Sequence, residues 1–463
     1  MSNSVEETAS KALLFQDLLR QKDYSKLRHS FKVTEVADIA EAAQGLEPLE
    51  IMTLLRLVPR VRRAGVFSYL PREKQEVLLT ELPDLSITAL LNDMEPDDRT
   101  KLLEELTPEI TDTILQRLNP SERRVAFQLL SYPEESVGRL MNPEFVTVQL
   151  GMRVSDAVEY VRWNAARYSE EILNKVFVID VRGHYLGEVS LPGLLIADPS
   201  SQPVDAVISK AQVFLLATDH QTKAVDFFRK YGRTIIPVLD EQGILLGVVT
   251  ADDVFELAEE EATEDIQQFG GTATLEDSYF DTPVWLMIRK RAGWLAILFL
   301  GGNFTSNAMH HYDGAIQSMR YLVYFLPLII SSGGNSGSQA ASLIIRGLAV
   351  REMRLADWLK ILKRELVMGF SLGLILGLLG FVRAVTWGEG VRVGLIILIS
   401  LIGVVTLGAV VGSMLPFLLK RLNLDPAVSS SPFIASLVDL FGIVIFFEVA
   451  LFFAKYFGPV VGV

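Results

Sequence analysis

The sequence predicts a multidomain α-helical membrane protein, in which a five-span transmembrane bundle follows an α-solenoid-like N-domain and two tandem α/β modules. Three observations predict it: long apolar segments after residue 284, prolines that recur every 12 or 13 residues, and two matching strand–turn–strand–helix segments. Half of the 463 residues are hydrophobic and none is cysteine. The missing cysteine excludes disulfides, cysteine-ligated zinc and cysteine nucleophiles.

Five apolar segments follow residue 284: Trp294–Ala308, Tyr321–Leu348, Leu366–Val385, Val393–Leu419 and Ala427–Phe453. Most reach the ~20 residues that a spanning helix needs, and the first does so when extended through Trp285–Ile288. Small residues every four positions (Gly369, Gly373 and Gly377) predict close packing of the third span against another helix. Residues 1–30 are polar and charged, so we expect no signal peptide.

The distribution of Lys and Arg predicts the orientation of these spans. Residues 284–463 carry 15 Lys and Arg against 8 Asp and Glu, whereas residues 1–283 carry 28 against 48. The loops on the side of the N-terminal half hold eleven basic residues and the opposite side holds four. By the positive-inside rule, we expect a multi-pass plasma-membrane protein with a cytosolic N-terminus and an outside C-terminus.

The N-terminal region contains an internal repeat. Prolines at 59, 71, 83, 96, 108, 120 and 133 separate short amphipathic pieces. Because Pro is favoured in the first helical turn, each predicts the start of a short helix in a solenoid-like stack. The acidic residues of this region fit either a sensor surface or an ordinary solvated face; they include Asp93, Glu95, Asp97, Asp98, Glu104 and Glu105.

Two segments that follow match each other: KVFVIDVRGHYLGEVSLPGLL and TIIPVLDEQGILLGVVTADDVFEL. They resemble the paired CBS modules that form ligand-sensing discs. Thr250 and Asp253 have the spacing with which such modules hold an adenosine ribose, which implies an ATP or other adenine-nucleotide site in the second copy. The first copy has Ser190-Leu-Pro-Gly193 there and lacks the Asp.

An acidic run on a predicted helix, Glu259 to Asp265, precedes the spans. Five carboxylates within seven residues repel one another unless cations lie between them. A divalent-cation sensor and a solvated linker helix both fit this pattern.

The least usual membrane segment is Phe325–Leu343, which contains a Pro, two adjacent Gly, an Asn and a Gln. Asp439 lies in a second apolar span without polar neighbours. Polar groups in a bilayer cost free energy unless they meet a partner or water, so both segments predict a cation pathway. Five helices hardly enclose such a pathway, and we therefore expect a homodimer with the pore on its axis.

Together these features resemble the MgtE family of magnesium channels and transporters, which is related to the solute-carrier 41 proteins. The motifs that carry the resemblance are PLIISSGGNSGSQ (327–339), YPEESVGRLMNPEF (132–145), EEEATEDI (259–266) and LDPAVSSSPFIASLVD (424–439). The resemblance implies an acidic superhelical N-domain (1–135), CBS domain 1 (136–200), CBS domain 2 (201–262), a connecting plug helix (263–283) and a five-helix transmembrane domain (284–463).

The resemblance also implies roles for single residues. Asp439, one from each subunit, would attract Mg²⁺ through its retained waters, and Asn335, Gly333 and Gly334 would supply oxygens or a narrow approach. Pro327 and Gln339 belong to the same pore motif, and Asp425 would face the plug helix. Regulatory Mg²⁺ ions would close the pore at high cytosolic Mg²⁺; their ligands would be Asp253, Glu256, Glu261, Glu264, Asp265, Asp97 and Asp98.

One departure concerns the sensor, because His220, Thr222 and Gly232 stand where carboxylates are expected. These substitutions predict weaker gating and leave the ion pathway unchanged. The alternative function is transport of another divalent cation (Co²⁺, Mn²⁺ or Ni²⁺) with weakened or no Mg²⁺ feedback. An oxygen-only lining disfavours soft metals. We expect no enzyme, because Glu448 lies nine residues from Asp439 and half a turn out of phase. The expected partners are a second copy, the bilayer and Mg²⁺, and no nucleic acid.

Overall fold

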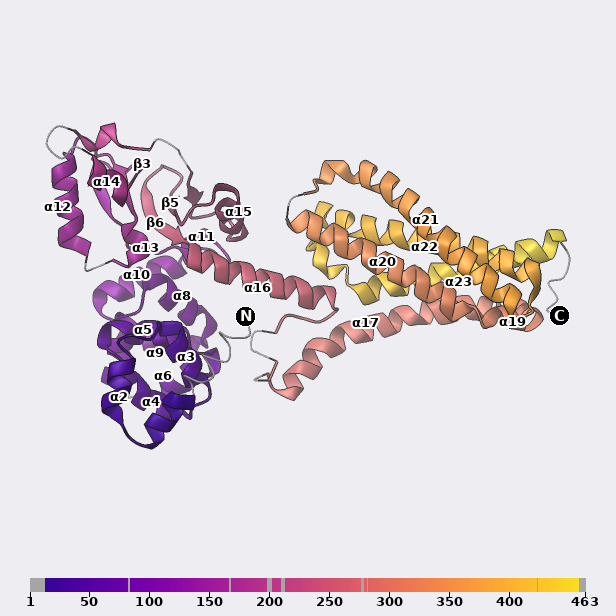
Figure 1. Cartoon of the computed structure of the whole chain (residues 1–463), viewed down its shortest axis with the longest axis horizontal. Coiled ribbons are helices and arrows are strands. Elements are labelled where there is room, and N and C mark those ends of the chain that lie inside the picture. The colour runs from indigo at the N-terminus through magenta and orange to yellow at the C-terminus, as the bar shows by residue number, and fades with distance from the viewer. Residues whose placement is uncertain are drawn as a thin grey trace. The chain divides into compact units, whose positions relative to one another are not determined.

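The structure, a computed structural model, describes residues 13–81, 84–165, 168–197, 202–209, 213–275, 279–280, 282–350, 352–422 and 424–457. The chain divides into two compact units, Met1–Glu259 and Glu260–Val463 (Figure 1). The first contains short helices and two small sheets, and the second contains long helices. Each unit is described by itself.

The first unit begins with short helices, which are α2 (Tyr24–Ser30), α3 (Val36–Gln44), α4 (Pro48–Leu57), α5 (Arg60–Ser68), α6 (Arg72–Glu81), α7 (Asp84–Asn92), α8 (Pro96–Glu105), α9 (Pro108–Arg117), α10 (Pro120–Leu130) and α11 (Val137–Leu140). The proline repeat correctly predicts most of their starts: Pro96, Pro108 and Pro120 are first residues, and Pro59 and Pro71 directly precede α5 and α6. Pro83 lies outside the described residues.

Pro133 is the exception, because α11 begins only at Val137. Here the backbone pairs with the second α/β module: Val137 N donates to Asp219 O (2.8 Å) and Gly138 N to Ala217 O (2.9 Å).

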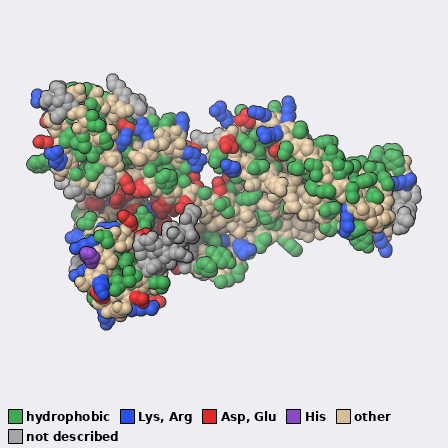
Figure 2. Space-filling model, viewed as in Figure 1, with side chains coloured by type: hydrophobic (Ala, Val, Ile, Leu, Met, Phe, Trp, Pro, Cys, Tyr) green, Lys and Arg blue, Asp and Glu red, His purple; other side chains and the backbone are tan. Residues whose placement is uncertain are grey.

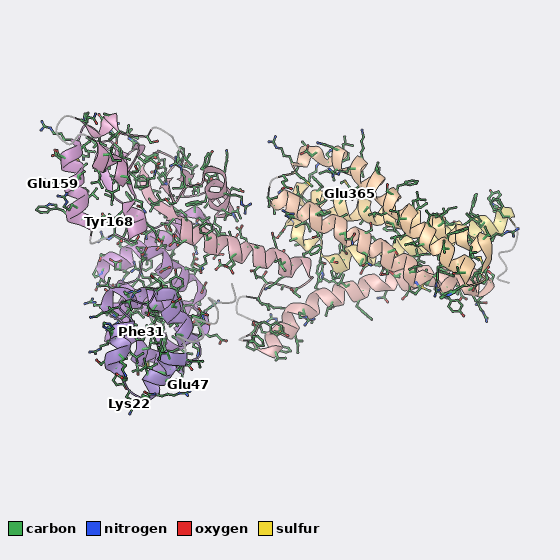
Figure 3. All side chains as sticks on the ribbon, viewed as in Figure 1. Lys22, Phe31, Glu47, Glu159, Tyr168 and Glu365 are labelled. Atoms are coloured by element: carbon green, nitrogen blue, oxygen red, sulfur yellow. The ribbon has the colours of Figure 1, made fainter. Side chains whose placement is uncertain are left out.

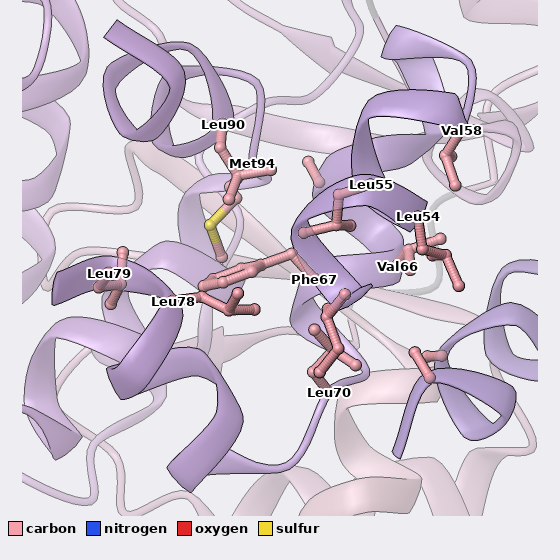
Figure 4. Packing of buried hydrophobic residues seen from close by; sticks show 14 of the residues in the cluster. Leu54, Leu55, Val58, Val66, Phe67, Leu70, Leu78, Leu79, Leu90 and Met94 are labelled. Carbon is pink, nitrogen blue, oxygen red and sulfur yellow. The ribbon is translucent and has the colours of Figure 1, made fainter. Parts of the chain in front are cut away.

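Helices two apart in the chain pack on each other, as in a superhelical stack. Their apolar faces form one core, in which the ring of Phe67 lies beside Leu78 and Met94 (Figure 4). Phe31, labelled in Figure 3, is fully buried against Phe15, with ring centroids 5.2 Å apart.

Two α/β modules complete the first unit. In the first module, β1 (Thr147–Gln149) runs parallel to β2 (Lys175–Ile179), and β2 pairs antiparallel with β3 (Tyr185–Ser190). The second module has the same order and directions in β4 (Leu215–Leu216), β5 (Ile235–Leu239) and β6 (Leu245–Thr250). Their helices are α12 (Val154–Asn164), α13 (Glu170–Leu173), α14 (Leu191–Ile196), η2 (Val204–Ala206), α15 (Thr222–Tyr231) and α16 (Ala251–Phe269).

The two modules join through equivalent residues. Tyr185 N donates to Gly243 O (3.0 Å), and Leu245 N donates to Gly183 O (3.2 Å). The matching segments of the sequence therefore form a pair with internal two-fold symmetry.

The connecting helix differs from its predicted range of 263–283. α16 continues without a break from the second module and ends at Phe269, and residues 270–275 are not helical. Gly271 explains the end, since its φ of +77° suits glycine and leaves the right-handed helical region.

The second unit consists of long helices and their short connections: α17 (Val284–His311), α18 (Asp313–Ser318), α19 (Arg320–Val323), α20 (Leu326–Ala349), η3 (Leu355–Asp357), α21 (Trp358–Thr386), α22 (Gly390–Arg421), η4 (Pro426–Val428) and α23 (Ser431–Phe457). Within the described residues, three helical segments are long and apolar enough to cross a membrane: Leu355–Thr386, Gly390–Arg421 and Ser431–Phe457. α17 and α20 have the length, at 28 and 24 residues, but contain more polar residues.

The predicted packing role of the glycines on the third apolar segment is confirmed. Gly369, Gly373 and Gly377 are buried on α21. A Cβ atom added at any of them would press on the backbone of α22. It would lie 2.7 Å from Thr406 Cα at Gly369, 2.7 Å from Ile402 Cα at Gly373, and 2.8 Å from the carbonyl oxygen of Leu398 at Gly377.

Candidate functional site

The polar motif of the second unit lies on α20, which packs against α22 and α23. Gly333 and Gly334 are buried in these contacts. A Cβ atom at Gly333 would lie 2.7 Å from Val438 Cγ1, and one at Gly334 would lie 3.5 Å from Ala435 Cβ. The two glycines therefore let α20 approach α23 closely.

A polar stripe lies on the exposed part of α20. Pro327, Ser331, Asn335 and Gln339 recur every four residues and are all exposed, so they share one helix face. Asn335 Nδ2 lies 3.4 Å from Ser331 Oγ.

Asp439 lies at the level of this stripe. Ser431 Oγ donates to Ser338 Oγ (2.8 Å), and the contacts of Gly334 and Gly333 with Ala435 and Val438 continue the antiparallel register. Asp439, which is partly exposed, follows Val438 directly. Asn335 is two residues from Gly333, so both side chains originate within about one helical turn along the bundle.

Asp425 and Asp265 lie near each other within the second unit. The pKa of Asp265 is raised to about 6, mainly because of burial and then by the charges of Asp425 and Glu264. Asp425 also accepts a hydrogen bond from Ala427 N (2.8 Å) at the start of η4. The structure thus brings Asp425 beside the helix that the resemblance identifies as the plug.

A second acidic cluster lies in the first unit, where the start of α8 meets the start of α16. It consists of Glu95, Asp97 and Asp98 on one side and Asp252, Asp253 and Glu256 on the other. Acidic side chains gather on the visible face of this unit in Figure 2. Asn142 Nδ2 donates to Glu95 Oε2 (3.0 Å) and Asp97 Oδ1 (3.3 Å).

The charges in this cluster repel one another. Loss of hydration raises the pKa of Glu95 and of Asp253 to about 7, and neighbouring carboxylates add to both shifts. The pKa of the buried Asp97 is also raised, first by desolvation and then by Asp253. A cation between the two helix starts would relieve this repulsion.

The described residues contain no group of three or more His, Asp or Glu side chains arranged to hold a metal ion. Glu256 instead forms an ion pair with Lys101 (2.8 Å). Glu264 accepts hydrogen bonds from Gln268 Nε2 (2.8 Å) and Thr274 Oγ1 (3.0 Å). Glu261 is also not without a partner in the structure.

The three positions that depart from the expected acids have local contacts. His220 Nε2 lies 3.0 Å from Glu135 Oε2, and its Nδ1 lies 3.1 Å from Thr222 Oγ1. Gly232 is the left-handed C-cap of α15, with φ +59°. His220, held by Thr222, thus contacts Glu135 in the segment before α11, and Gly232 ends α15.

The residues of the possible nucleotide site are paired with each other. Thr250 is 5% exposed and its hydroxyl donates to Asp253 Oδ2. In the first module, Ser190 Oγ accepts from Gly193 N (3.1 Å) and caps α14.

Glu188 is a buried carboxylate that the sequence analysis missed. It is 2% exposed, and its Oε1 accepts from Lys175 Nζ (2.8 Å) and from Arg233 Nη1 (2.5 Å) of the other module. The sequence feature that could have indicated it is the single charged residue in the mostly apolar strand YLGEVS.

Comparison with known proteins decides the family. The model of the MgtE divalent cation transporters matches residues 326–449, that of the MgtE intracellular N domain matches 34–135, and that of the CBS domain matches 204–260. The magnesium transporter MgtE of Thermus thermophilus is 36% identical over 323 residues, which are 70% of this chain and 71% of the relative. This chain belongs to the MgtE family. The Enterococcus faecalis magnesium transporter MgtE is 30% identical over 71% of the chain and 72% of its own length.

Solved structures match about half of the chain. The cytosolic domain of the Mg²⁺ channel MgtE in complex with ATP has a TM-score of 0.50 and 29% identity, covering 53% of this chain and 99% of that one. The soluble part of a magnesium transporter has a TM-score of 0.52 at 23% identity, covering 55% and 99%. The predicted N-domain and CBS pair are thereby confirmed as an MgtE-type fold.

Proposed function

We propose that this MgtE-family protein imports Mg²⁺ across the plasma membrane through a channel, and that its cytosolic part closes the channel when internal Mg²⁺ is high. The observation that supports this proposal best is the antiparallel register of α20 and α23, in which Asp439 lies within about one helical turn of Asn335 in the exposed polar stripe. Relatives at 36% and 30% identity are magnesium transporters.

In the membrane, five helices (α17, α20, α21, α22 and α23) span the bilayer, with the N-terminus cytosolic. The polar stripe of α20 is exposed in a single chain. A second copy facing it would line a pore on the dimer axis, which supports a homodimer. Mg²⁺ dehydrates reluctantly, so two Asp439 carboxylates attract it through retained water, while Pro327, Asn335 and Gln339 border the path.

Closure uses the acidic cluster and the acidic end of α16. Without Mg²⁺, Asp97, Asp98 and Asp253 repel across the two helix starts. Mg²⁺ between them stabilises the joined arrangement, and Glu256, Glu261 and Glu264 extend the same acidic face. Asp265 and Asp425 form the corresponding pair beside the pore domain. A ligand that binds one of two states shifts the population toward that state.

Two narrower proposals concern the nucleotide and the cargo. A relative's cytosolic domain binds ATP, so Thr250 and Asp253 are our candidates for an adenine nucleotide contact, once their mutual hydrogen bond opens. The alternative cargo is Mn²⁺, Co²⁺ or Ni²⁺ with weakened feedback. The local roles of His220, Thr222 and Gly232 support the weakened feedback and do not bear on the cargo.

The test is ion uptake into proteoliposomes containing the full chain, with Mg²⁺, Mn²⁺, Co²⁺ or Ni²⁺ outside. We expect Mg²⁺ flux that falls when Mg²⁺ is added on the side of the soluble domains. Flux of Mn²⁺, Co²⁺ or Ni²⁺ without Mg²⁺ flux would establish the alternative cargo. Absence of any divalent flux would contradict both.

A further inference from the structure

A cavity in the second unit lies outside the proposed ion path. Its volume is about 660 Å³, within the range of small-molecule sites. It lies among the end of α16, residues 271–274, the first turns of α17 and Val428 of η4. Leu286 and Trp294 supply apolar walls, and Arg289 and Lys290 supply positive charge.

The wall around Trp294 is held by specific contacts. Its Nε1 donates to Ser430 Oγ (3.0 Å), and its ring lies 6.2 Å from that of Phe433. Gly271 lies so close that an added Cβ would be 2.7 Å from Trp294 Cδ1. The end of α16, α17 and the start of α23 therefore meet around this cavity.

The polar groups suit a ligand with a phosphate and a hydrogen-bond donor. Arg289 is exposed and has no hydrogen bond or ion pair to any described residue. Lys290 Nζ donates to Thr274 O. The buried Oε1 of Gln268 has no donor among the described residues and can accept from a headgroup hydroxyl or ammonium. The nearby acid, Glu264, accepts from Gln268 and Thr274.

The surroundings match a membrane interface. α17 begins with the exposed apolar residues Val284, Trp285 and Ile288, directly before Arg289. Aromatic and basic residues together are typical of the headgroup level, where basic side chains attract anionic lipids. This placement rests on the membrane orientation given under the proposed function.

We propose that this cavity binds one anionic phospholipid, whose phosphate meets Arg289 and Lys290 and whose glycerol and upper chain contact Leu286, Trp294 and Val428. A bound lipid would hold the end of α16 against α17 and η4. Because η4 leads into α23, the lipid would bias the segment that carries Asp439.

The experiment measures lipid binding to the purified full chain in detergent by native mass spectrometry, titrating phosphatidylglycerol or phosphatidylcholine. We expect tighter binding of phosphatidylglycerol, weakened about fivefold by Arg289→Gln, with no change in Arg364→Gln, an exposed arginine on α21. Gly293→Leu should fill the cavity and weaken binding, whereas Gly301→Leu on the same helix should not; a Cβ at either glycine meets no atom within 4 Å.

Equal binding of the two lipids, or equal loss in Gly293→Leu and Gly301→Leu, would overturn the proposal. Displacement of the lipid by an equal concentration of glycerol 3-phosphate would show a site for free phosphates and would also overturn it. Binding is measured without transport, so a failure here is distinguishable from a failure of the proposed channel.

Discussion

Asp439 owes its position to small residues on the neighbouring helix. Gly333 and Gly334 have no side chain, and this allows α20 to lie directly on Val438 and Ala435. The carboxylate one residue further on then reaches the level of Asn335 at a partly open face. At the residue scale, the glycines set the spacing of the two helices, and in the proposed function the polar side chains contact the ion.

Asp253→Asn should stabilise the first unit at neutral pH without Mg²⁺. The pKa of Asp253 is 3.8 by itself and about 7 in the folded protein, so the folded state binds an extra proton between these values. The free energy of unfolding therefore falls as pH rises from about 4 to about 7, and the repulsion is greatest above 7. The Asn variant should show a smaller fall and a higher Tm at pH 8, by roughly 2–4 °C for each kcal/mol of repulsion removed.

The measurement is thermal unfolding of the intact protein in EDTA at pH 5 and pH 8. Asp112→Asn is the matched control, since Asp112 is an exposed aspartate on α9, outside the acidic cluster. An Asp253→Asn variant with the same pH dependence as the wild type would contradict the account.

Single residues could be predicted unevenly. Asp439 stands out in the sequence because no polar residue surrounds it, whereas the partners of Asp253 are far away in the chain, at Glu95, Asp97 and Asp98. Glu188 was missed for the same reason: Arg233, which pairs with it, comes from the other module. Contacts between distant segments leave little trace in one sequence.

At the element scale, helix contacts in the second unit depend on close backbone approach. A Cβ atom at Gly408 or Gly412 of α22 would overlap the carbonyl oxygens of Gly333 or Gly337 of α20. Ser336 Oγ also donates to Val405 O (3.2 Å) across this contact. These two helices therefore pack through backbone atoms, which makes their spacing sensitive to one methyl group.

Gly412→Ala should lower the stability of the second unit by about 1–3 kcal/mol, because the added methyl group forces α20 and α22 apart. Thermal unfolding in detergent measures the effect. Gly302→Ala is the control, since its Cβ meets no atom within 4 Å. Equal stability of the two variants would contradict the close packing seen here.

Elements with a strong local signal were predicted well. Prolines mark helix starts because proline suits the first turn, and the CBS repeat shows in matching strands and Gly turns. The connecting helix ends at Phe269, early in its predicted range of 263–283, because Gly271 has a left-handed φ that the helix cannot continue through. Among the described residues, three helical segments are long and apolar enough to cross a membrane. α17 and α20 are not among them, because their polar residues lower their mean hydropathy.

At the scale of the whole molecule, the proposed function links acidic groups of the first unit with polar groups of the helical bundle. In that proposal, Mg²⁺ that has entered through the bundle relieves repulsion between the acidic groups. The transported ion would thereby favour the closed state, and reciprocal linkage would require that closure raise the affinity of the acidic groups for Mg²⁺.

Glu261→Ala combined with Glu264→Ala should weaken closure. Removing two carboxylates lowers the affinity of the α16 acidic face for Mg²⁺, so uptake should continue at internal Mg²⁺ concentrations that stop the wild type. Mg²⁺ uptake by proteoliposomes at a series of internal Mg²⁺ concentrations measures this. Unchanged shut-off would remove these two residues from the sensor.

The most direct test of the central claim is Mg²⁺ flux through Asp439→Asn, compared with Glu448→Gln in matched proteoliposomes. Glu448 is on the same helix, but it accepts a hydrogen bond from Tyr312 Oη (2.8 Å), and at nine residues from Asp439 it faces the opposite side of α23. The account predicts that Asp439→Asn loses nearly all flux while Glu448→Gln keeps it. Wild-type flux in Asp439→Asn would contradict a pathway through this carboxylate.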